Sequence, residues 1–212
     1  MRALYARDFA DVTSSSGLPT STARAAAWAD FNNDGHIDLF VAQTSQLELY
    51  VNDGTGSFST AWVGAATDPT SLSTADVDNN GYLDVFVCNR GTDQLLYNWG
   101  EYFEGWTGAG DPLISNEASW VDYNSDGWVD LYLASQDGSK MFRNNGPGAG
   151  YPSNIHTWSW TTITTYPLGD PGPGKAVSWS DFDKDGDSDL FLSNGGPNTT
   201  CHVATTLCVN MT

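Results

Sequence analysis

Short apolar runs recur along this chain and predict buried β-strands. The four clearest are three residues long and stand at 39–41, 85–87, 131–133 and 190–192. Each run places an aromatic residue between two aliphatic ones. Runs this short, without the 3.6-residue period of a helix, are typical of strands that are covered on both faces.

A further strand is predicted 10 or 11 residues after the start of each of the first three runs and 17 residues after the start of the fourth. Apolar pairs that lead toward asparagine stand at 49–52, 96–98, 141–144 and 207–210. Asn-Asp-Gly at 52–54 and Asn-Asn-Gly at 144–146 indicate hairpin turns. An outer strand follows, most clearly at 57–63. With one strand before each run, the predicted unit has four strands.

A polar segment of nine residues precedes each apolar run, and all four segments share one pattern. They read DFNNDGHID from Asp30, DVDNNGYLD from Asp76, DYNSDGWVD from Asp122 and DFDKDGDSD from Asp181. Positions 1 and 9 are Asp, positions 3 and 5 are Asp or Asn, and position 6 is Gly. Carboxylates this dense repel one another, so the folded loops need a cation. An all-oxygen ligand set on a flexible loop favours Ca²⁺ over Mg²⁺ or Zn²⁺.

The predicted calcium ligands are the side-chain oxygens at positions 1, 3, 5 and 9 and the backbone carbonyl at position 7. Glycine at position 6 allows the sharp turn between them. Up to four Ca²⁺ ions are expected. The ligand residues are Asp30, Asn32, Asp34, His36 and Asp38; Asp76, Asp78, Asn80, Tyr82 and Asp84; Asp122, Asn124, Asp126, Trp128 and Asp130; and Asp181, Asp183, Asp185, Asp187 and Asp189.

Two other interpretations fit the loops less well. An EF-hand begins with the same spacing but needs a bidentate Glu at position 12, where this chain has Val41, Val87, Leu133 and Leu192. Acidic turns without a metal are the second alternative, because Asp, Asn and Gly are common turn formers. Fourfold repetition of one ligand pattern favours the metal.

The loops start 46, 46 and 59 residues apart, a period typical of propeller blades with four strands. We therefore predict an all-β propeller with four-stranded antiparallel blades, as one domain over residues 1–212. The predicted divisions are a closing outer strand and linker at 1–22, then blades at 23–68, 69–114, 115–173 and 174–212. The last blade lacks an outer strand of its own.

The four loops and the apolar strands that follow them resemble the FG-GAP/VCBS repeat family. That family includes the propellers of integrin α subunits and certain fungal lectins, and the resemblance covers nearly the whole chain. It implies Ca²⁺ bound along one rim and ligands recognised elsewhere, on loops or between blades. Family propellers usually have seven blades, so four motifs indicate either a four-bladed propeller or part of a larger one.

The strand count also predicts a spare strand near the N-terminus. Residues 9–13 look like the family's blade-ending strand, and the fourth unit is one strand short. We expect this strand to complete the last blade of its own chain or of a neighbour, because an open edge invites aggregation. Pairing with a neighbour would give a homo-oligomer or a head-to-tail polymer. The third alternative is a fragment of a longer propeller.

Composition narrows the range of partners and compartments. A net charge of −18 with only 8 basic residues excludes a nucleic-acid surface and argues against an anionic membrane. The longest apolar run has about five residues, far fewer than a bilayer span needs. Loops of this kind usually bind calcium weakly, so millimolar extracellular calcium favours an extracellular or cell-surface location.

No catalytic pattern stands out in the sequence. Ser and Cys do not occur in a nucleophile elbow, and an enzyme would need an acid pair outside the loops, such as Glu101 with Glu104. We predict a non-catalytic module for recognition or adhesion, with a glycan or an extracellular protein as partner. The alternatives are a structural subunit of an extracellular assembly joined by strand exchange and, less favoured, a glycan-active enzyme.

Aromatic residues outside the repeat suggest where a glycan could bind. Trp99 and Trp106 belong to the least core-like aromatic cluster, with Tyr102 and Phe103. Exposed aromatic faces stack on sugar rings and anchor interfaces. We therefore predict Trp99 and Trp106 as ligand-binding residues, with packing between blades as the alternative.

Three cysteines and two sequons complete the set of candidate sites. Cys201 and Cys208 lie close in sequence and are predicted to form a local disulfide, whereas Cys88 aligns with small residues and is predicted to be a buried thiol. Asn198 and Asn210 begin N-x-[ST] sequons and are candidate glycosylation sites.

Overall fold

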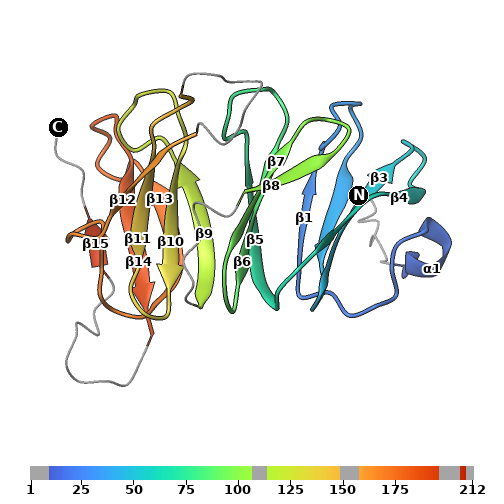
Figure 1. Cartoon of the computed structure of the whole chain (residues 1–212), viewed down its shortest axis with the longest axis horizontal. Coiled ribbons are helices and arrows are strands. Elements are labelled where there is room, and N and C mark those ends of the chain that lie inside the picture. Colours follow the sequence, from blue (N-terminus) through green and yellow to red (C-terminus); the bar gives the residue numbers. More distant parts are fainter. Residues whose placement is uncertain (1–9, 107–113, 149–157, 196–205, 209–212) are drawn as a thin grey trace, which may run out of the picture.

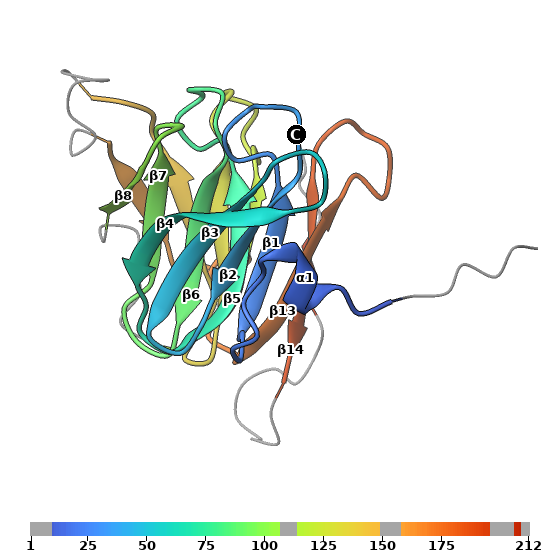
Figure 2. The same cartoon turned by 90° about the vertical axis from the view of Figure 1, so that its right-hand side faces the viewer.

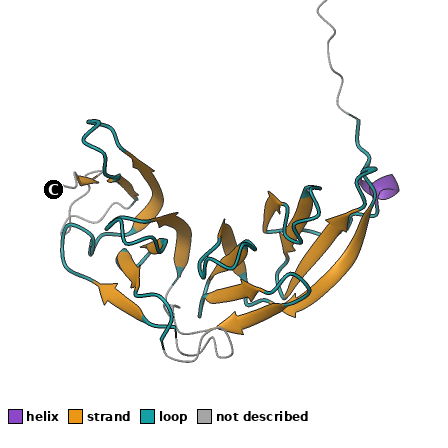
Figure 3. Ribbon diagram, turned by 90° about the horizontal axis from the view of Figure 1, so that it is seen from above, coloured by secondary structure: helices purple, strands orange, loops and turns teal. Residues whose placement is uncertain are grey.

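The computed structural model describes residues 10–106, 114–148, 158–195 and 206–208 as a series of antiparallel sheets. The sheets follow one another in chain order and stand side by side around an arc (Figures 1 and 3). The predicted all-β propeller architecture is confirmed. Within the described ranges, no helix is long and apolar enough to cross a membrane.

Three of the sheets contain four strands each in consecutive order, and the fourth contains three described strands. The first sheet comprises β1 (Ala25–Ala29), β2 (Asp38–Ala42), β3 (Gln46–Asn52) and β4 (Phe58–Ala65). The second comprises β5 (Pro69–Ala75), β6 (Asp84–Asn89), β7 (Gln94–Asn98) and β8 (Phe103–Trp106). The third comprises β9 (Ser115–Val121), β10 (Asp130–Ser135), β11 (Lys140–Asn144) and β12 (Trp160–Ile163), and the fourth β13 (Gly174–Ser180), β14 (Asp189–Asn194) and β15 (Thr206–Cys208).

The four sheets share one register and one mode of contact. The residue two positions before each acidic loop pairs with the first apolar residue after it, as Trp28 with Leu39 and Trp120 with Leu131. The first strands β1, β5, β9 and β13 contact one another in sequence. Among the described residues, no extensive contact joins the first sheet to the fourth, so the arc is open (Figure 3).

The strand predicted at 9–13 is wrong over its described part. Residues 10–12 are in no strand, and helix α1 (Thr13–Ser16) follows. The carboxylate of Asp11 accepts a hydrogen bond from the amide of Thr13 (3.0 Å), and the carbonyl of Val12 accepts two from backbone amides of α1. These local bonds compete with strand pairing. Leu18 then packs on the first sheet, where Figure 2 shows α1, rather than on the fourth.

The core lies between the sheets, and the second strands of the first three sheets each contribute to two layers of it. In β2, Phe40 packs toward the second sheet, whereas Leu39 and Val41 belong to a cluster on the opposite face. The same alternation turns Phe86 in β6 and Tyr132 in β10 toward the following sheet. We call the face toward the previous sheet in chain order the preceding face and the face toward the next sheet the following face. Both faces are apolar, which explains the uninterrupted apolar runs.

Buried asparagines at the ends of third strands tie neighbouring sheets together. Asn98, which ends β7, donates from Nδ2 to the carbonyl of Phe31 in the first sheet (2.8 Å) and to that of Leu83 in its own (3.0 Å). Asn144, which ends β11, donates in the same way to the carbonyl of Val77 in the second sheet (3.0 Å). Each joint between two of the first three sheets thus contains a buried hydrogen bond from an asparagine side chain to a backbone carbonyl.

Replacement of Asn98 by Ala should destabilise the protein by about 1 to 3 kcal/mol, because it leaves buried carbonyls without a donor. Asn52 is the matched control, since it occupies the same position in the first sheet but donates from Nδ2 to the carbonyl of Ile37 in its own loop. Asn52→Ala should cost clearly less. Urea denaturation measures both free energies of unfolding, and equal losses would contradict the assignment.

Candidate metal sites in the acidic loops

The four acidic loops join the first strand of each sheet to the second and lie along one rim of the arc, the upper edge in Figure 1. Position 4 links successive loops. The Nδ2 of Asn33 donates to the carbonyl of Gly81 (2.7 Å), and the Nδ2 of Asn79 donates to that of Gly127 (3.1 Å). The first three loops therefore form one hydrogen-bonded row.

Each loop is folded by bonds from backbone amides to its own carboxylate and amide oxygens. In the second loop, Asp76 accepts from the amides of Asn80 (3.0 Å) and Gly81 (2.9 Å). Asp78 also accepts from the Asn80 amide (3.1 Å), and the side chain of Asn80 accepts from the amide of Tyr82 (2.8 Å). The other loops repeat most of these bonds. The sequence pattern thus encodes a common loop geometry.

Two left-handed residues give each loop its curl. Glycine at position 6 has φ between 87° and 101° in the four loops, a conformation that favours glycine. Position 4 is also left-handed, with φ between 55° and 65°, at Asn33, Asn79, Ser125 and Lys184. This curl is why residues that alternate in sequence can face one point.

The aspartate at position 9 is the most buried carboxylate of each loop. Asp38, Asp84 and Asp130 have no exposed surface, and Asp189 is buried as well. One oxygen of Asp84 accepts from the amide of Val77 (2.8 Å) and the other from the amide of Asn98 (2.7 Å). The first and third loops repeat both bonds. This carboxylate therefore joins the loop, the second strand and the third strand.

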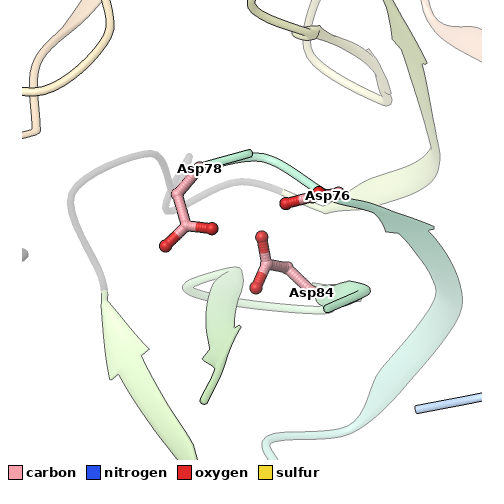
Figure 4. Close-up of side chains that lie close together, drawn as sticks. All are labelled: Asp76, Asp78 and Asp84. Atoms are coloured by element: carbon pink, nitrogen blue, oxygen red, sulfur yellow. The ribbon is translucent and has the colours of Figure 1, made fainter. Parts of the chain in front are cut away.

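The carboxylates at positions 1, 3 and 9 converge in two of the loops. Figure 4 shows Asp76, Asp78 and Asp84 around one space, and one oxygen from each lies within 4.8 Å of the others. The fourth loop brings Asp181, Asp183 and Asp189 together in the same way. Oxygens that share a calcium ion at 2.3–2.6 Å lie within about 5 Å of one another. In loops one and three, position 3 is Asn32 or Asn124, which offers an amide oxygen instead.

The electrostatics of the loops fit a cation. Burial raises the pKa of Asp84 well above its ordinary value and that of Asp130 to about 7, and neighbouring loop carboxylates act in the same direction. In the fourth loop, the protein covers both carboxylate oxygens of Asp187, and this burial together with the neighbouring carboxylates of the loop raises its pKa. A divalent ion would compensate such groups. The twenty predicted ligands thus lie in loops suited to a metal, and their individual roles stay predictions.

The side chain at position 7 has a packing role that sequence reasoning missed. The rings of His36, Tyr82 and Trp128 lie over glycines in the hairpin turns of their own sheets. A Cβ at Gly54 would stand 2.6 Å from the His36 ring, and one at Gly100 would stand 2.7 Å from that of Tyr82. The signal was present in the sequence, since an Asn-x-Gly turn follows each of these loops at the same distance.

The predicted ligand-binding role of Trp99 stays a prediction, and the structure shows how the side chain packs. Its ring is partly buried and packs against the core cluster that contains Tyr97 and Phe142. The alternative interpretation, packing between sheets, accounts for the buried part of this ring. Trp106 lies in β8, where its backbone pairs with Leu95, and its side chain falls outside the described part of the structure.

A cleft of about 350 Å³ opens between the outer strands of the first two sheets. It lies between β3 and β4 on one side and the turn from β7 to β8 on the other. Tyr102 is 53% exposed, and Trp62 packs on Phe103 with ring centroids 5.1 Å apart. The lining residues are Asn32, Leu49, Val51, Ala61, Trp62, Gly100, Glu101, Tyr102 and Phe103. Glu101 lines this cleft and Glu104 does not, so the two do not form an acid pair across it.

The remaining candidates divide into one confirmed residue and several that lie outside the described residues. Cys88 is a fully buried free thiol, as predicted. Cys201, Asn198 and Asn210 lie outside the described ranges, as does the side chain of Cys208. The disulfide and the glycosylation sites therefore stay predictions.

Comparison with known proteins yields one family and two solved structures. The model of the FG-GAP-like repeat matches residues 30–87 and 122–192. No curated protein matches the sequence. The crystal structure of BBS1N in complex with ARL6DN, soaked with lead, contains a chain of similar fold, with a TM-score of 0.53 and 9% identity over 82% of this chain and 51% of that one. A structure of the Photorhabdus luminescens Tc holotoxin pore matches 86% of this chain and 9% of its own, with a TM-score of 0.44 and 18% identity.

The match is shorter than the matched protein: this chain spans about half the length of the matched BBS1N chain. At 9% identity the likeness concerns the fold alone.

Replacement of Asn33 by Gly should cost about 0.5 to 1.5 kcal/mol relative to Ser125→Gly, because only the first change removes a bond between loops. Both residues have positive φ, so glycine relieves the same strain at each site. Urea denaturation under identical ionic conditions provides the comparison. Equal free energies of unfolding would show that the row of loops does not contribute to stability.

Proposed function

Because the chain belongs to the FG-GAP-like repeat family, we propose that it is a non-catalytic β-propeller module that calcium stabilises outside the cell. The observation that carries this proposal is the convergence of Asp76, Asp78 and Asp84 in a loop whose pattern occurs four times. The donors are carboxylate and amide oxygens, which are the ligands that Ca²⁺ prefers.

When bound, calcium would supply positive charge that the loops themselves lack. Side-chain oxygens at positions 1, 3, 5 and 9 and the carbonyl at position 7 would hold it. Four ions would add eight positive charges and change the net charge from −18 to −10. The ion would then compensate the negative charge of the position-9 aspartate, in addition to the backbone amides that already donate hydrogen bonds to it. Loops that bind weakly fill only where calcium is millimolar, which supports an extracellular or cell-surface location.

The cleft between the first two sheets supports a role in recognition. Its volume falls within the range of small-molecule pockets. Trp62, Tyr102 and Phe103 provide apolar faces, and Glu101 and Asn32 provide polar groups. This combination suits the apolar face and hydroxyls of a sugar ring, or an apolar side chain of a protein ligand. Asn32 also belongs to the first acidic loop, so calcium there would order one wall of the cleft.

Removal of calcium should lower the melting temperature by many degrees, because each loop then holds several unneutralised carboxylates. Asp78→Asn should weaken one site by reducing its charge while keeping the fold, since Asn occurs naturally at the same position in loops one and three. Asp53→Asn is the matched control, because Asp53 stands in an exposed hairpin turn where the third sheet has Asn145.

Calorimetric titration with Ca²⁺ and differential scanning fluorimetry measure these effects. The wild type and Asp53→Asn should show the same number of sites and the same affinity, and Asp78→Asn should lose or weaken one site. A melting temperature that does not change in excess chelator would contradict the calcium proposal.

Tyr102→Ala combined with Glu101→Gln should abolish binding to a glycan array and leave the melting temperature nearly unchanged, since both residues are exposed. Val63→Ala is the control, because Val63 is 53% exposed on the same strand as Trp62 but does not line the cleft. Binding that survives the double substitution would place recognition elsewhere.

A further inference from the structure

Equivalent aromatic residues of the four repeats have very different exposures. The central residue of each second strand faces the following sheet, and Phe40, Phe86 and Tyr132 are completely buried there. Phe191 holds the same position in β14 and is 47% exposed. The difference arises because none of the described sheets lies beyond the fourth (Figure 1).

Position 2 of the acidic loops repeats this contrast. Phe31 and Val77 are buried against the following sheet, and Tyr123 packs into the next cluster. Phe182, at the same position of the fourth loop, is 52% exposed. The following face of the fourth sheet thus presents two aromatic residues whose counterparts are core residues elsewhere in the chain.

The other end of the arc exposes the complementary half of the same contact. Trp120 packs edge-on against Phe86 of the preceding sheet, with centroids 6.1 Å apart, and Trp179 packs in the same way against Tyr132, at 5.8 Å. Trp28 holds the equivalent position in β1 and is 58% exposed. An unmatched tryptophan therefore stands at one end, and an unmatched phenylalanine at the other.

We propose that a second copy of this chain binds head to tail, with its Trp28 against Phe191 of the first copy. The contact continues the joint that already exists between the second and third and between the third and fourth sheets. It joins two different faces and is therefore heterologous, so it closes only if the arc returns on itself. Because the arc is curved (Figure 3), two copies that each offer Trp28 at one end and Phe191 at the other can close into a pair with two identical contacts.

The chain already covers the part of the first sheet that this contact does not need. Leu39, Val41 and Tyr50 also point away from the second sheet, but Leu18 and Phe58 bury them. Trp28 remains open beside Phe58, with ring centroids 5.8 Å apart. The partner's Phe191 would therefore meet an edge that is already flanked by an aromatic residue. This proposal does not depend on calcium binding or on a ligand in the cleft.

The test measures the mass of the 212-residue chain in solution by light scattering and sedimentation velocity over a range of concentrations. The wild type should reach twice 22.8 kDa. Phe191→Ser and Trp28→Ser should each shift the equilibrium toward the monomer by at least tenfold in dissociation constant. Tyr102→Ser is the control, because Tyr102 is equally exposed but lies in the cleft between the first two sheets.

Mixing the two variants distinguishes this contact from a symmetric one. A mixed pair contains one intact Trp28–Phe191 contact, so the mixture should associate more tightly than either variant alone. Melting temperatures close to wild type show that both variants are folded, as expected for exposed positions. The proposal is overturned by a wild-type monomer at all concentrations, by a dimer that neither variant weakens, or by a ladder of masses above the dimer, which excludes a closed pair.

Discussion

The buried carboxylate at the end of each acidic loop is the constraint on which the rest of the structure depends. Asp84 accepts hydrogen bonds from two backbone amides: that of Val77, just after the loop begins, and that of Asn98, at the end of the third strand. Burying a carboxylate costs free energy unless bonds or ions compensate it. Loop, second strand and third strand therefore have to assemble around it together, and they do so at the same place in the first three sheets.

The joints between sheets derive from this arrangement. The backbone that folds over the position-9 aspartate also presents the carbonyl of Phe31, which accepts from Asn98 of the next sheet. On the apolar side, the alternation along the second strand sends Phe40 forward and Leu39 backward. Polar and apolar contacts thus fix the same neighbour relation, and a single sheet cannot satisfy either set by itself.

The sequence predicted the repeated features well, because the same physical requirement appears four times. The strands after each loop and the common loop pattern all follow from that repetition. It failed where only one copy existed: residues 9–13 looked like a strand, but Asp11 accepts a bond from the amide of Thr13, which begins the short helix α1. Trp99 looked exposed because glycine and glutamate surround it, yet its side chain packs between sheets.

Some functional residues were visible in the sequence but their partners were not. Asn33 and Asn79 stand at the same loop position, but nothing in a linear pattern indicates that they reach the next loop. The cleft beside Tyr102 combines residues from two sheets and from an acidic loop. Contacts of this kind depend on the angle between sheets, which the spacing of motifs does not encode.

Each joint between sheets brings a following face against a preceding face, and this polarity bears on how genes for such chains change in length. The two faces of a sheet differ from each other, but at every boundary the following face of one sheet fits the preceding face of the next. Deletion of residues 69–114, one whole 46-residue unit, would place Trp120 beside Phe40, a pairing like the one that Trp120 makes with Phe86. Duplication of the same unit would likewise create only familiar boundaries. Recombination can therefore vary the number of units while every interface stays of an inherited kind.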